Sequence, residues 1–296
     1  MLSLNISDLT NQEAYQLLST AIAPRPICFA STTDLEGNVN LSPFSFFNLM
    51  SSNPPICVFS PVNRGRDGSA KNTLENVREV AEVVINIVNY KMVQQTSLAS
   101  TEYAKGVNEF EKAGFTEIAS TKIKPPRVKE APVQLECRVN DIIVLGNEGG
   151  AGHLIIAEVL AIHIHEDILD ENGKIDVFKI DQVARLGGSW YSRITKESLF
   201  EVAKPLSKLG IGVDALPNEI KNSKILTGNH LGQLGNVENL PFDTEIEKYI
   251  QNKEIKDILD STIGDATTRL LQIHLKAAEL LDEGRVEEAW KILLVD

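Results

Sequence analysis

The stretch from residue 23 to residue 48 places hydroxyl and amide side chains among aromatic rings. Its hydrogen-bonding groups are Ser31, Thr32, Asn40, Ser42 and Ser45, and its flat apolar surfaces are Phe44, Phe46 and Phe47. Aromatic rings beside several hydrogen-bond donors can hold a planar heteroaromatic ligand. The alternative is a pair of ordinary core strands whose hydroxyls face outward, since Ser and Thr are common in strands.

A second stretch, residues 59–76, joins a basic loop to the start of a predicted helix. Arg64, Arg66 and Lys71 lie in the loop, and Thr73 stands in the first helical turn. Backbone N–H groups at a helix start, a hydroxyl and a lysine can together hold a phosphate. The positive cluster stands out because the chain carries a formal net charge of −12. The alternative is a solvated loop with surface basic residues.

The overall charge excludes some classes of partner. There are 29 Lys and Arg residues against 41 Asp and Glu residues, a balance that repels phosphate backbones and acidic lipid surfaces. The 43% hydrophobic and 24% charged fractions are those of an ordinary globular protein. No run of residues approaches the ~20 apolar positions of a membrane span. We therefore expect neither nucleic acid nor membrane as a partner.

The cysteines indicate a reducing compartment. Cys28, Cys57 and Cys137 are odd in number and show no C-x-x-C spacing. Residues 1–8 are polar and do not read as a secretory signal. We expect three reduced, buried thiols in a cytoplasmic protein.

Two histidines raise the alternative of a metal centre. His163 and His165 alternate along a predicted strand, so they share a face and could ligate a metal. A double-stranded β-helix metal enzyme would use such a pair, with Glu158 and Glu166 nearby in sequence. The other interpretation is exposed strand histidines, and our prediction is that the protein has no metal site.

Short strand-like segments must position these residues. The predicted strands are 27–33, 40–50, 56–60, 83–88, 133–145 and 153–165, and residues 34–38 read as a hairpin turn. The predicted helices are 10–22, which opens with the capping-box spacing of Thr10 and Glu13, then 73–80 and 90–100. Many short strands favour a barrel or sandwich over a doubly wound sheet. The sequence contains no G-x-G-x-x-G motif after a strand and no Walker lysine motif.

The composition changes after about Lys196, and 296 residues suffice for one large domain or two smaller ones. We expect residues 1–200 to form the domain that carries the candidate residues. Residues 201–296 are predicted to form a linker or loop region and a C-terminal helical extension. Within it, residues 205–241 show little periodicity, and residues 243–294 have helical spacing that we interpret as an αα-hairpin appendage.

Several long motifs in a fixed order resemble the flavin reductase-like family, whose members are FMN-binding split-barrel proteins. The motifs are PRPICFASTTDLEGNVNLSPFSFFN, FSP followed by R-x-R and KNT-LEN, VINIV, STEYAKGVNEFEKAG, PPRVKEAPVQLEC and RLGGSWYSRI. Together they span roughly residues 15–195. The resemblance implies a mainly β fold with helices, a Greek-key barrel. It also implies non-covalent FMN near a homodimer interface and electron transfer from NADH or NADPH.

The resemblance also implies roles for individual residues. It places Ser31, Thr32 and Asn40 in the first flavin-contacting strands, and Lys71 and Thr73 in a K-D-T motif that holds the phosphate. The isoalloxazine ring would be lined by Pro43, Phe44, Ser45, Phe46 and Asn48. The implied cofactor-binding set also includes Ser60 of the FSP motif, Arg66, Asn72 (where the motif has Asp) and Tyr191 near the flavin edge. Arg64 is a further candidate for the phosphate, and Arg185 and Arg193 would meet the ligand or a partner subunit.

We expect an FMN-dependent NAD(P)H oxidoreductase, a flavin reductase able to supply reduced flavin to a monooxygenase. The alternative is an FMN-binding electron carrier or flavin-storage protein without its own NAD(P)H activity. No side chain need be catalytic because hydride transfer is the cofactor's chemistry. His153 is the one candidate, since the family tends to place His or Asn near the flavin or nicotinamide. Residues 209–235 would form a flexible cover over the flavin pocket, or else a linker or a second-subunit contact.

Overall fold

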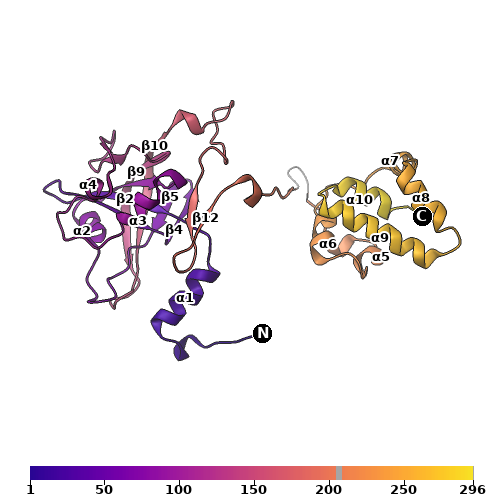
Figure 1. The fold of residues 1–296 in the computed structure, drawn as a ribbon, viewed down its shortest axis with the longest axis horizontal. Coiled ribbons are helices and arrows are strands. Elements are labelled where there is room, and N and C mark those ends of the chain that lie inside the picture. Colours follow the sequence, from indigo (N-terminus) through magenta and orange to yellow (C-terminus); the bar gives the residue numbers. More distant parts are fainter. Residues whose placement is uncertain (205–208, 296) are drawn as a thin grey trace. The chain divides into compact units, whose positions relative to one another are not determined.

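The chain forms two compact units in a computed structural model that describes residues 1–204 and 209–295 (Figure 1). The first unit is Met1–Leu199 and the second is Phe200–Asp296. None of the helices in these described ranges has the length and apolar character that a bilayer crossing demands.

A seven-stranded sheet in the order β3-β2-β6-β9-β10-β5-β4 organises the first unit, and every neighbouring pair in it runs antiparallel. Its strands are β2 (Cys28–Thr33), β3 (Val39–Phe44), β4 (Phe47–Ser52), β5 (Pro55–Phe59), β6 (Glu82–Ile87), β9 (Val133–Val144) and β10 (His153–Ile164). A three-stranded sheet joins β1 (Arg25–Pro26), β11 (Val183–Arg185) and β12 (Tyr191–Arg193), and β7 (Glu117–Ile118) pairs with β8 (Arg127–Val128). The expected mainly β architecture is therefore confirmed.

One predicted strand was wrong, because residues 40–50 form two strands and not one. β3 ends at Phe44 and β4 begins at Phe47, and the two strands lie at opposite edges of the large sheet. The chain bends at Ser45 and Phe46, where the carbonyl of Phe46 accepts a hydrogen bond of 2.8 Å from the backbone N–H of Ser60. The aromatic pattern continues through the bend, so the sequence shows no break there.

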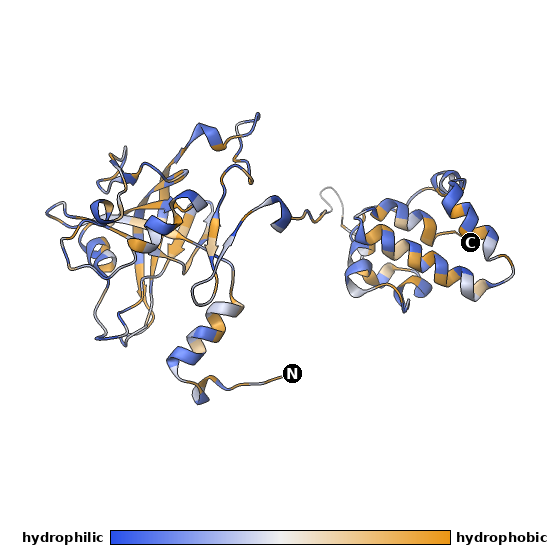
Figure 2. Cartoon of the chain, viewed as in Figure 1, coloured by the Kyte–Doolittle hydropathy of each residue, from blue (hydrophilic) through white to orange (hydrophobic). Residues whose placement is uncertain are grey.

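Both faces of the central strands are buried, and all six residues of β2 are buried although three of them are Ser or Thr. Phe29 packs with Leu41 and Met92 on one side of the sheet. Cys28 packs on the other side in a cluster that includes Phe59 and Ile85. Figure 2 shows the apolar residues gathered on these strands. All three cysteines are free and buried, and burial raises the pKa of the Cys28 and Cys57 thiols.

The first unit also contains several short helices. They are α1 (Asn11–Ala21), α2 (Asn72–Glu79), α3 (Val93–Leu98) and α4 (Glu109–Ala113), with 3₁₀ turns η1 (Ile6–Asp8), η2 (Tyr90–Met92), η3 (Glu166–Ile168) and η4 (Lys196–Ser198). The predicted capping box is confirmed, since the side chains of Thr10 and Glu13 each accept from the other's backbone N–H. Helix α2 carries several of the candidate residues. Its Leu74 and Val77 are buried in the core, and this packing fixes the position of its first turn.

The second unit is a helical body with its own core. It contains η5 (Val213–Ala215), α5 (Asn218–Lys221), α6 (Gly228–Gly235), α7 (Asp243–Tyr249), α8 (Lys253–Ser261), α9 (Ala266–Asp282) and α10 (Val286–Leu293). Leu280 and Trp290 lie at the centre of this core, and the indole N–H of Trp290 donates to the carbonyl of Leu234 at 3.1 Å. The expected αα-hairpin exists as α9 and α10, but it is only part of a larger body.

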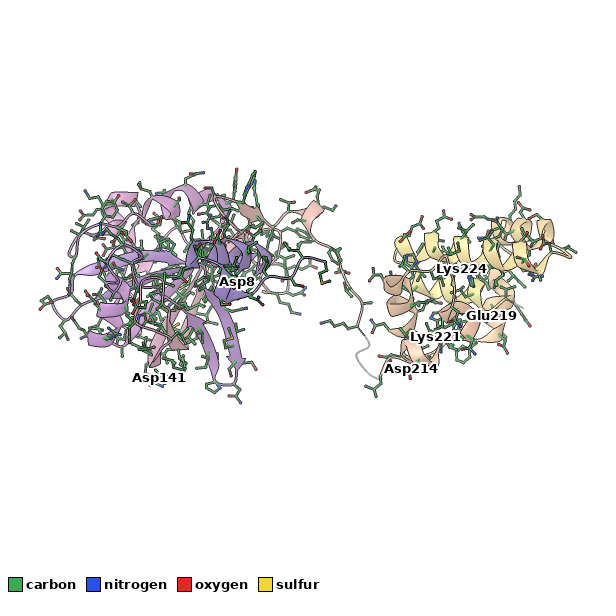
Figure 3. All side chains as sticks on the ribbon, turned by 90° about the horizontal axis from the view of Figure 1, so that it is seen from below. Asp8, Asp141, Asp214, Glu219, Lys221 and Lys224 are labelled. Atoms are coloured by element: carbon green, nitrogen blue, oxygen red, sulfur yellow. The ribbon has the colours of Figure 1, made fainter. Side chains whose placement is uncertain are left out.

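Residues 209–235 are not a simple linker, because they pack into the core of the second unit. The alternatives of a cover over the flavin pocket and of a second-subunit contact stay predictions. Leu216, Ile220, Leu226 and Leu234 are buried in the same core as Trp290. Helices of four and eight residues are too short to show a clear apolar period, which is why the sequence did not reveal them. Charged side chains cover the outside of the segment, and Figure 3 labels Asp214, Glu219, Lys221 and Lys224. Residues 205–208 of the stretch with little periodicity lie outside the described residues.

Candidate functional site

Candidate residues on β2 and β3 form side-chain hydrogen bonds with residues of α2. The amide of Asn40 donates to the hydroxyl of Thr73 at 2.8 Å, and the amide of Asn76 donates to the hydroxyl of Thr32 at 3.2 Å. All four side chains are buried, and the buried hydroxyl of Ser31 has no hydrogen-bond partner in the described part of the chain. The Thr73 hydroxyl therefore faces the sheet and anchors α2, while the backbone N–H groups of the first turn remain as donors for an anion.

The basic loop between β5 and α2 brings three of the predicted residues together. The guanidinium of Arg64 donates to the carbonyl of Ala70, to the hydroxyl of Ser69 at 3.1 Å and to the amide oxygen of Asn72 at 3.3 Å. Lys71 occupies the N-cap position of α2, and its side chain makes no capping hydrogen bond. An uncapped helix start beside two cationic side chains is a site where an anion is stabilised.

Arg66 lies outside this group. Its side chain is 77% exposed and contacts Asp67 at 3.2 Å. Arg66 is therefore much more exposed than Arg64 and Lys71, although its charge still reaches Glu102, the partner of Lys71.

Glu102 is a member of the basic cluster that sequence reasoning missed. Its carboxylate accepts from the ammonium of Lys71 at 2.7 Å and lies 3.9 Å from the guanidinium of Arg64. The hydrogen bond from Lys71 lowers the pKa of Glu102, and the charges of Lys71, Arg64 and Arg66 lower it further. Glu102 is therefore ionised at neutral pH. It belongs to the STEYAKG motif, but no local signal connects that motif to Lys71.

The PFSFFN segment divides into core residues and surface residues. Pro43 and Phe44 end β3, and the ring of Phe44 packs 5.6 Å from the ring of Phe59, within the core. Phe46 is 41% exposed, and Asn48 is exposed on β4. Phe46 and Asn48 can therefore contact a ligand, while Phe44 packs against the core.

Arg25 ties this segment to the small sheet. Its guanidinium lies 6.0 Å from the ring centre of Phe46, and its Nε donates to the hydroxyl of Ser45 at 3.5 Å. It also donates to the carbonyl of Leu186 at 3.1 Å. Arg25 is buried, so it holds Ser45 and Phe46 in place and is not free for a ligand. The sequence offered no reason to single it out.

Ser60 and His153 join the start of the basic loop to β10. The Ser60 hydroxyl accepts from the backbone N–H of His153 at 3.1 Å. A Cβ on Gly152 would lie only 2.6 Å from that hydroxyl, so this position requires glycine. Ser60 thus serves the packing of two strands, and its N–H binds the carbonyl of Phe46.

The imidazole of His153 holds the basic loop in place. Its Nε2 lies 2.8 Å from the amide oxygen of Asn63, whose NH₂ group donates to the carbonyls of Asn147 and Glu148 at 3.3 Å each. Burial lowers the pKa of His153, and the charge of Arg78 lowers it further. The ring is therefore neutral, with Nε2–H donating to Asn63 and a buried Nδ1 that has no partner among the described residues.

Tyr191 lies in a separate group. It is 38% exposed and lines a cleft together with Arg185 and Arg193. The guanidinium of Arg185 lies 4.6 Å from the ring centre of Tyr191. Ser100 lines the same cleft and lies two residues before Glu102 in the chain.

His163 is engaged with a carboxylate. Its Nε2 lies 2.7 Å from Glu136, a buried side chain that also accepts from the backbone N–H groups of Thr121 and Lys122. Burial alone would raise the pKa of Glu136, but these hydrogen bonds lower it overall. No group of three or more His, Cys, Asp or Glu side chains able to hold a metal ion occurs within residues 1–204 and 209–295.

The chain is similar to proteins that share this sheet. Residues 20–179 match the family described as flavin reductase like domain. An uncharacterised protein of Aquifex aeolicus is 34% identical over 197 residues, which are 67% of this chain and 98% of that protein. Among solved structures, nitrilotriacetate monooxygenase component B from Bacillus cereus is 31% identical with a TM-score of 0.64, covering 68% of this chain and 98% of its own.

A second solved structure is that of the 2-nitrobenzoate 2-nitroreductase NbaA from Pseudomonas fluorescens. It is 29% identical with a TM-score of 0.61, covering 71% of this chain and 100% of its own. The family match and the order of the motifs agree with the antiparallel sheet of the first unit. The chain therefore belongs to the flavin reductase-like family, and its first unit has the split-barrel fold.

Proposed function

We propose that the first unit binds FMN non-covalently and is an oxidoreductase that takes electrons from NADH or NADPH for flavin or another acceptor. The observation that supports it most is the uncapped start of α2 beside Arg64 and Lys71. In a chain of formal net charge −12, this is a local site for an anion. Bound FMN would supply the hydride and electron chemistry.

The residues present fit a phosphate at this position. Lys71, Arg64 and the first-turn N–H groups of Asn72 and Thr73 would hold it, and each charge-assisted hydrogen bond contributes about 1.5–3 kcal/mol. Lys71 is already paired with Glu102, so an incoming phosphate competes with that carboxylate. The buried bonds from Asn40 to Thr73 and from Asn76 to Thr32 fix the helix start in advance of binding.

We assign the isoalloxazine ring to the surface formed by Ser45, Phe46 and Asn48, next to the buried Ser60. The backbone bond from Ser60 to Phe46 joins the two segments that carry these residues. Phe46 offers a half-exposed aromatic face, and Asn48 offers an exposed amide. Ser60 also begins the loop that leads to Arg64 and Lys71. One ligand would therefore have its ring near Phe46 and its phosphate near Lys71, at the two ends of this segment.

We extend the proposal to a homodimer with FMN near the interface, from which reduced flavin diffuses to a monooxygenase partner. Apolar side chains are exposed at one edge of the large sheet, with Leu49 at 60% and Met50 at 63% on β4. On β10, Ile162 is 60% exposed. Exposed apolar groups of this kind mark association surfaces. The similar Bacillus cereus protein is itself named as component B of a monooxygenase.

The test is the absorption spectrum of the purified protein with FMN, followed by anaerobic addition of NADH or NADPH. Rapid loss of the flavin band at about 450 nm is the expected result, because reduction removes that absorption. A protein that binds FMN but is bleached by neither nucleotide would be an electron carrier or a flavin-storage protein. A protein that takes up no FMN would overturn the whole proposal.

A further inference from the structure

A cleft of about 460 Å³ lies between η2–α3 and the β11–β12 hairpin of the first unit. Its lining is polar and aromatic and includes Tyr90, Ser97, Ser100, Arg185, Tyr191 and Arg193. This volume falls in the range of ordinary small-molecule sites. The residues proposed to hold the FMN phosphate and ring do not line it, although Tyr191, which the family resemblance places near the flavin edge, does.

The two arginines of the cleft differ in their electrostatic state. Arg193 lies 3.8 Å from the ring centre of Tyr90 and makes two bonds to the carboxylate of Asp181, at 2.6 and 3.0 Å. A bidentate pair of this kind neutralises the guanidinium. Arg193 therefore shapes the cleft without giving it a net charge.

Arg185 keeps its charge. Its hydrogen bonds go to the carbonyls of Gly188 at 2.8 Å and Trp190 at 3.4 Å, and none of the described carboxylates forms an ion pair with it. A guanidinium has five N–H donors, so donors remain for a ligand. The hydroxyls of Ser97, Ser100, Ser189 and Ser192 line the same space. A cation with spare donors among hydroxyls binds a carboxylate or a phosphate.

Two lining residues connect the cleft to segments of the proposed flavin site. Ser100 lies two residues before Glu102, the partner of Lys71. Arg185 pairs across strands with Arg25, whose guanidinium contacts Ser45 and Phe46. The cleft is therefore linked through the backbone to the segments that carry Lys71's partner and Phe46.

We propose that this cleft binds the anionic group of a planar substrate, with Arg185 as its counter-ion and the ring of Tyr191 as its stacking face. The assignment of this ligand as the reaction partner of the flavin rests on the proposed function. A phosphate of a nicotinamide dinucleotide and a carboxylate of an aromatic acceptor share this chemistry, and separate titrations with NADP⁺ and benzoate distinguish them.

The experiment compares the full-length protein with Arg185→Gln, Arg185→Lys and Lys174→Gln, after reconstitution with FMN. Lys174 is exposed in a loop outside the cleft, so its substitution is the matched loss of one positive charge. The binding of NADP⁺, benzoate and uncharged nicotinamide is titrated through the flavin absorption. We expect Arg185→Gln to raise the Kd of NADP⁺ or of benzoate by about tenfold or more, because a charge-assisted contact is lost. Nicotinamide binding and the Lys174→Gln protein should be unaffected.

The probe that responds identifies the ligand. A shift for NADP⁺ assigns the cleft to the electron donor, and a shift for benzoate assigns it to an acidic aromatic acceptor. Arg185→Lys keeps the charge but loses the planar fork, and should fall between the wild type and Arg185→Gln. Unchanged affinity for both anions in a folded Arg185→Gln protein would overturn the inference. If the wild type takes up no FMN, the proposed function fails separately, and the same anions are titrated by calorimetry against the FMN-free proteins.

Discussion

The ammonium of Lys71 lies 2.7 Å from the carboxylate of Glu102, a residue 31 positions further along the chain. This pair places a negative charge at the start of α2, where the proposed function needs a positive one. Glu102 is 46% exposed, so it can turn into solvent when an anion arrives. The affinity for FMN is therefore expected to reflect a competition between phosphate and this carboxylate.

Lys71→Ala should weaken FMN binding by about tenfold or more, because one charge-assisted contact to phosphate is lost. Fluorescence titration of free FMN measures the effect. Lys174→Ala, in an exposed loop, is the matched control. Equal affinity of the Lys71→Ala protein and the wild type would place the phosphate elsewhere.

Glu102→Gln should strengthen FMN binding several-fold, since the competing charge is removed while the shape is kept. The gain should shrink as salt is added, because the interaction is partly exposed and screened. The same titration at low and high ionic strength checks this. Weaker binding would mean that Glu102 instead holds Lys71 in its binding position.

Thr73→Val should lower the free energy of unfolding by about 1–3 kcal/mol, because the buried amide of Asn40 loses its acceptor. Valine keeps the shape of threonine, so packing changes little. Urea denaturation measures the loss, and Thr73→Ser is the control that keeps the hydroxyl. If the valine variant is as stable as the wild type, the bond contributes nothing to stability.

His153 should make stability fall in mild acid. Its pKa is lowered below 6.5 in the folded protein, first by burial and then by Arg78. The unfolded chain therefore binds the proton more readily, so this contribution is complete above about pH 6.5 and is lost as the pH falls toward the folded value. Urea midpoints measured from pH 7.5 to 5 should fall more steeply for the wild type than for His153→Gln. Parallel curves would contradict this.

The two tryptophans should differ sharply in their effect on stability. Trp290 is 1% exposed in the core of the second unit, whereas Trp190 is 75% exposed. Trp290→Ala should cost about 3–5 kcal/mol, and Trp190→Ala about 0.5 kcal/mol or less. Thermal unfolding followed by circular dichroism compares them. Similar melting curves for the two variants would show that the second unit does not depend on this core.

Several elements could be predicted because their signals are local. The capping box of Thr10 and Glu13 spans four residues, and the turn between β2 and β3 is closed by Asp34, which accepts from the N–H of Asn38 at 2.8 Å. The long strands β9 and β10 have continuous β-type patterns on either side of a glycine-rich loop. Each of these signals lies within one helix, strand or turn, so it can be recognised in the sequence without knowledge of the fold.

By itself, the sequence determined the family, the mainly β first unit and the residue types available for an anion and a planar ring. The tertiary structure decided how those residues are used. It turned the hydroxyl of Thr73 toward Asn40, 33 residues away, and brought Glu102 to Lys71. It also left Arg185 charged while pairing Arg193 with Asp181. Such pairs form only when strands and helices distant in sequence pack together, and the periodicity of a single segment carries no information about its partner.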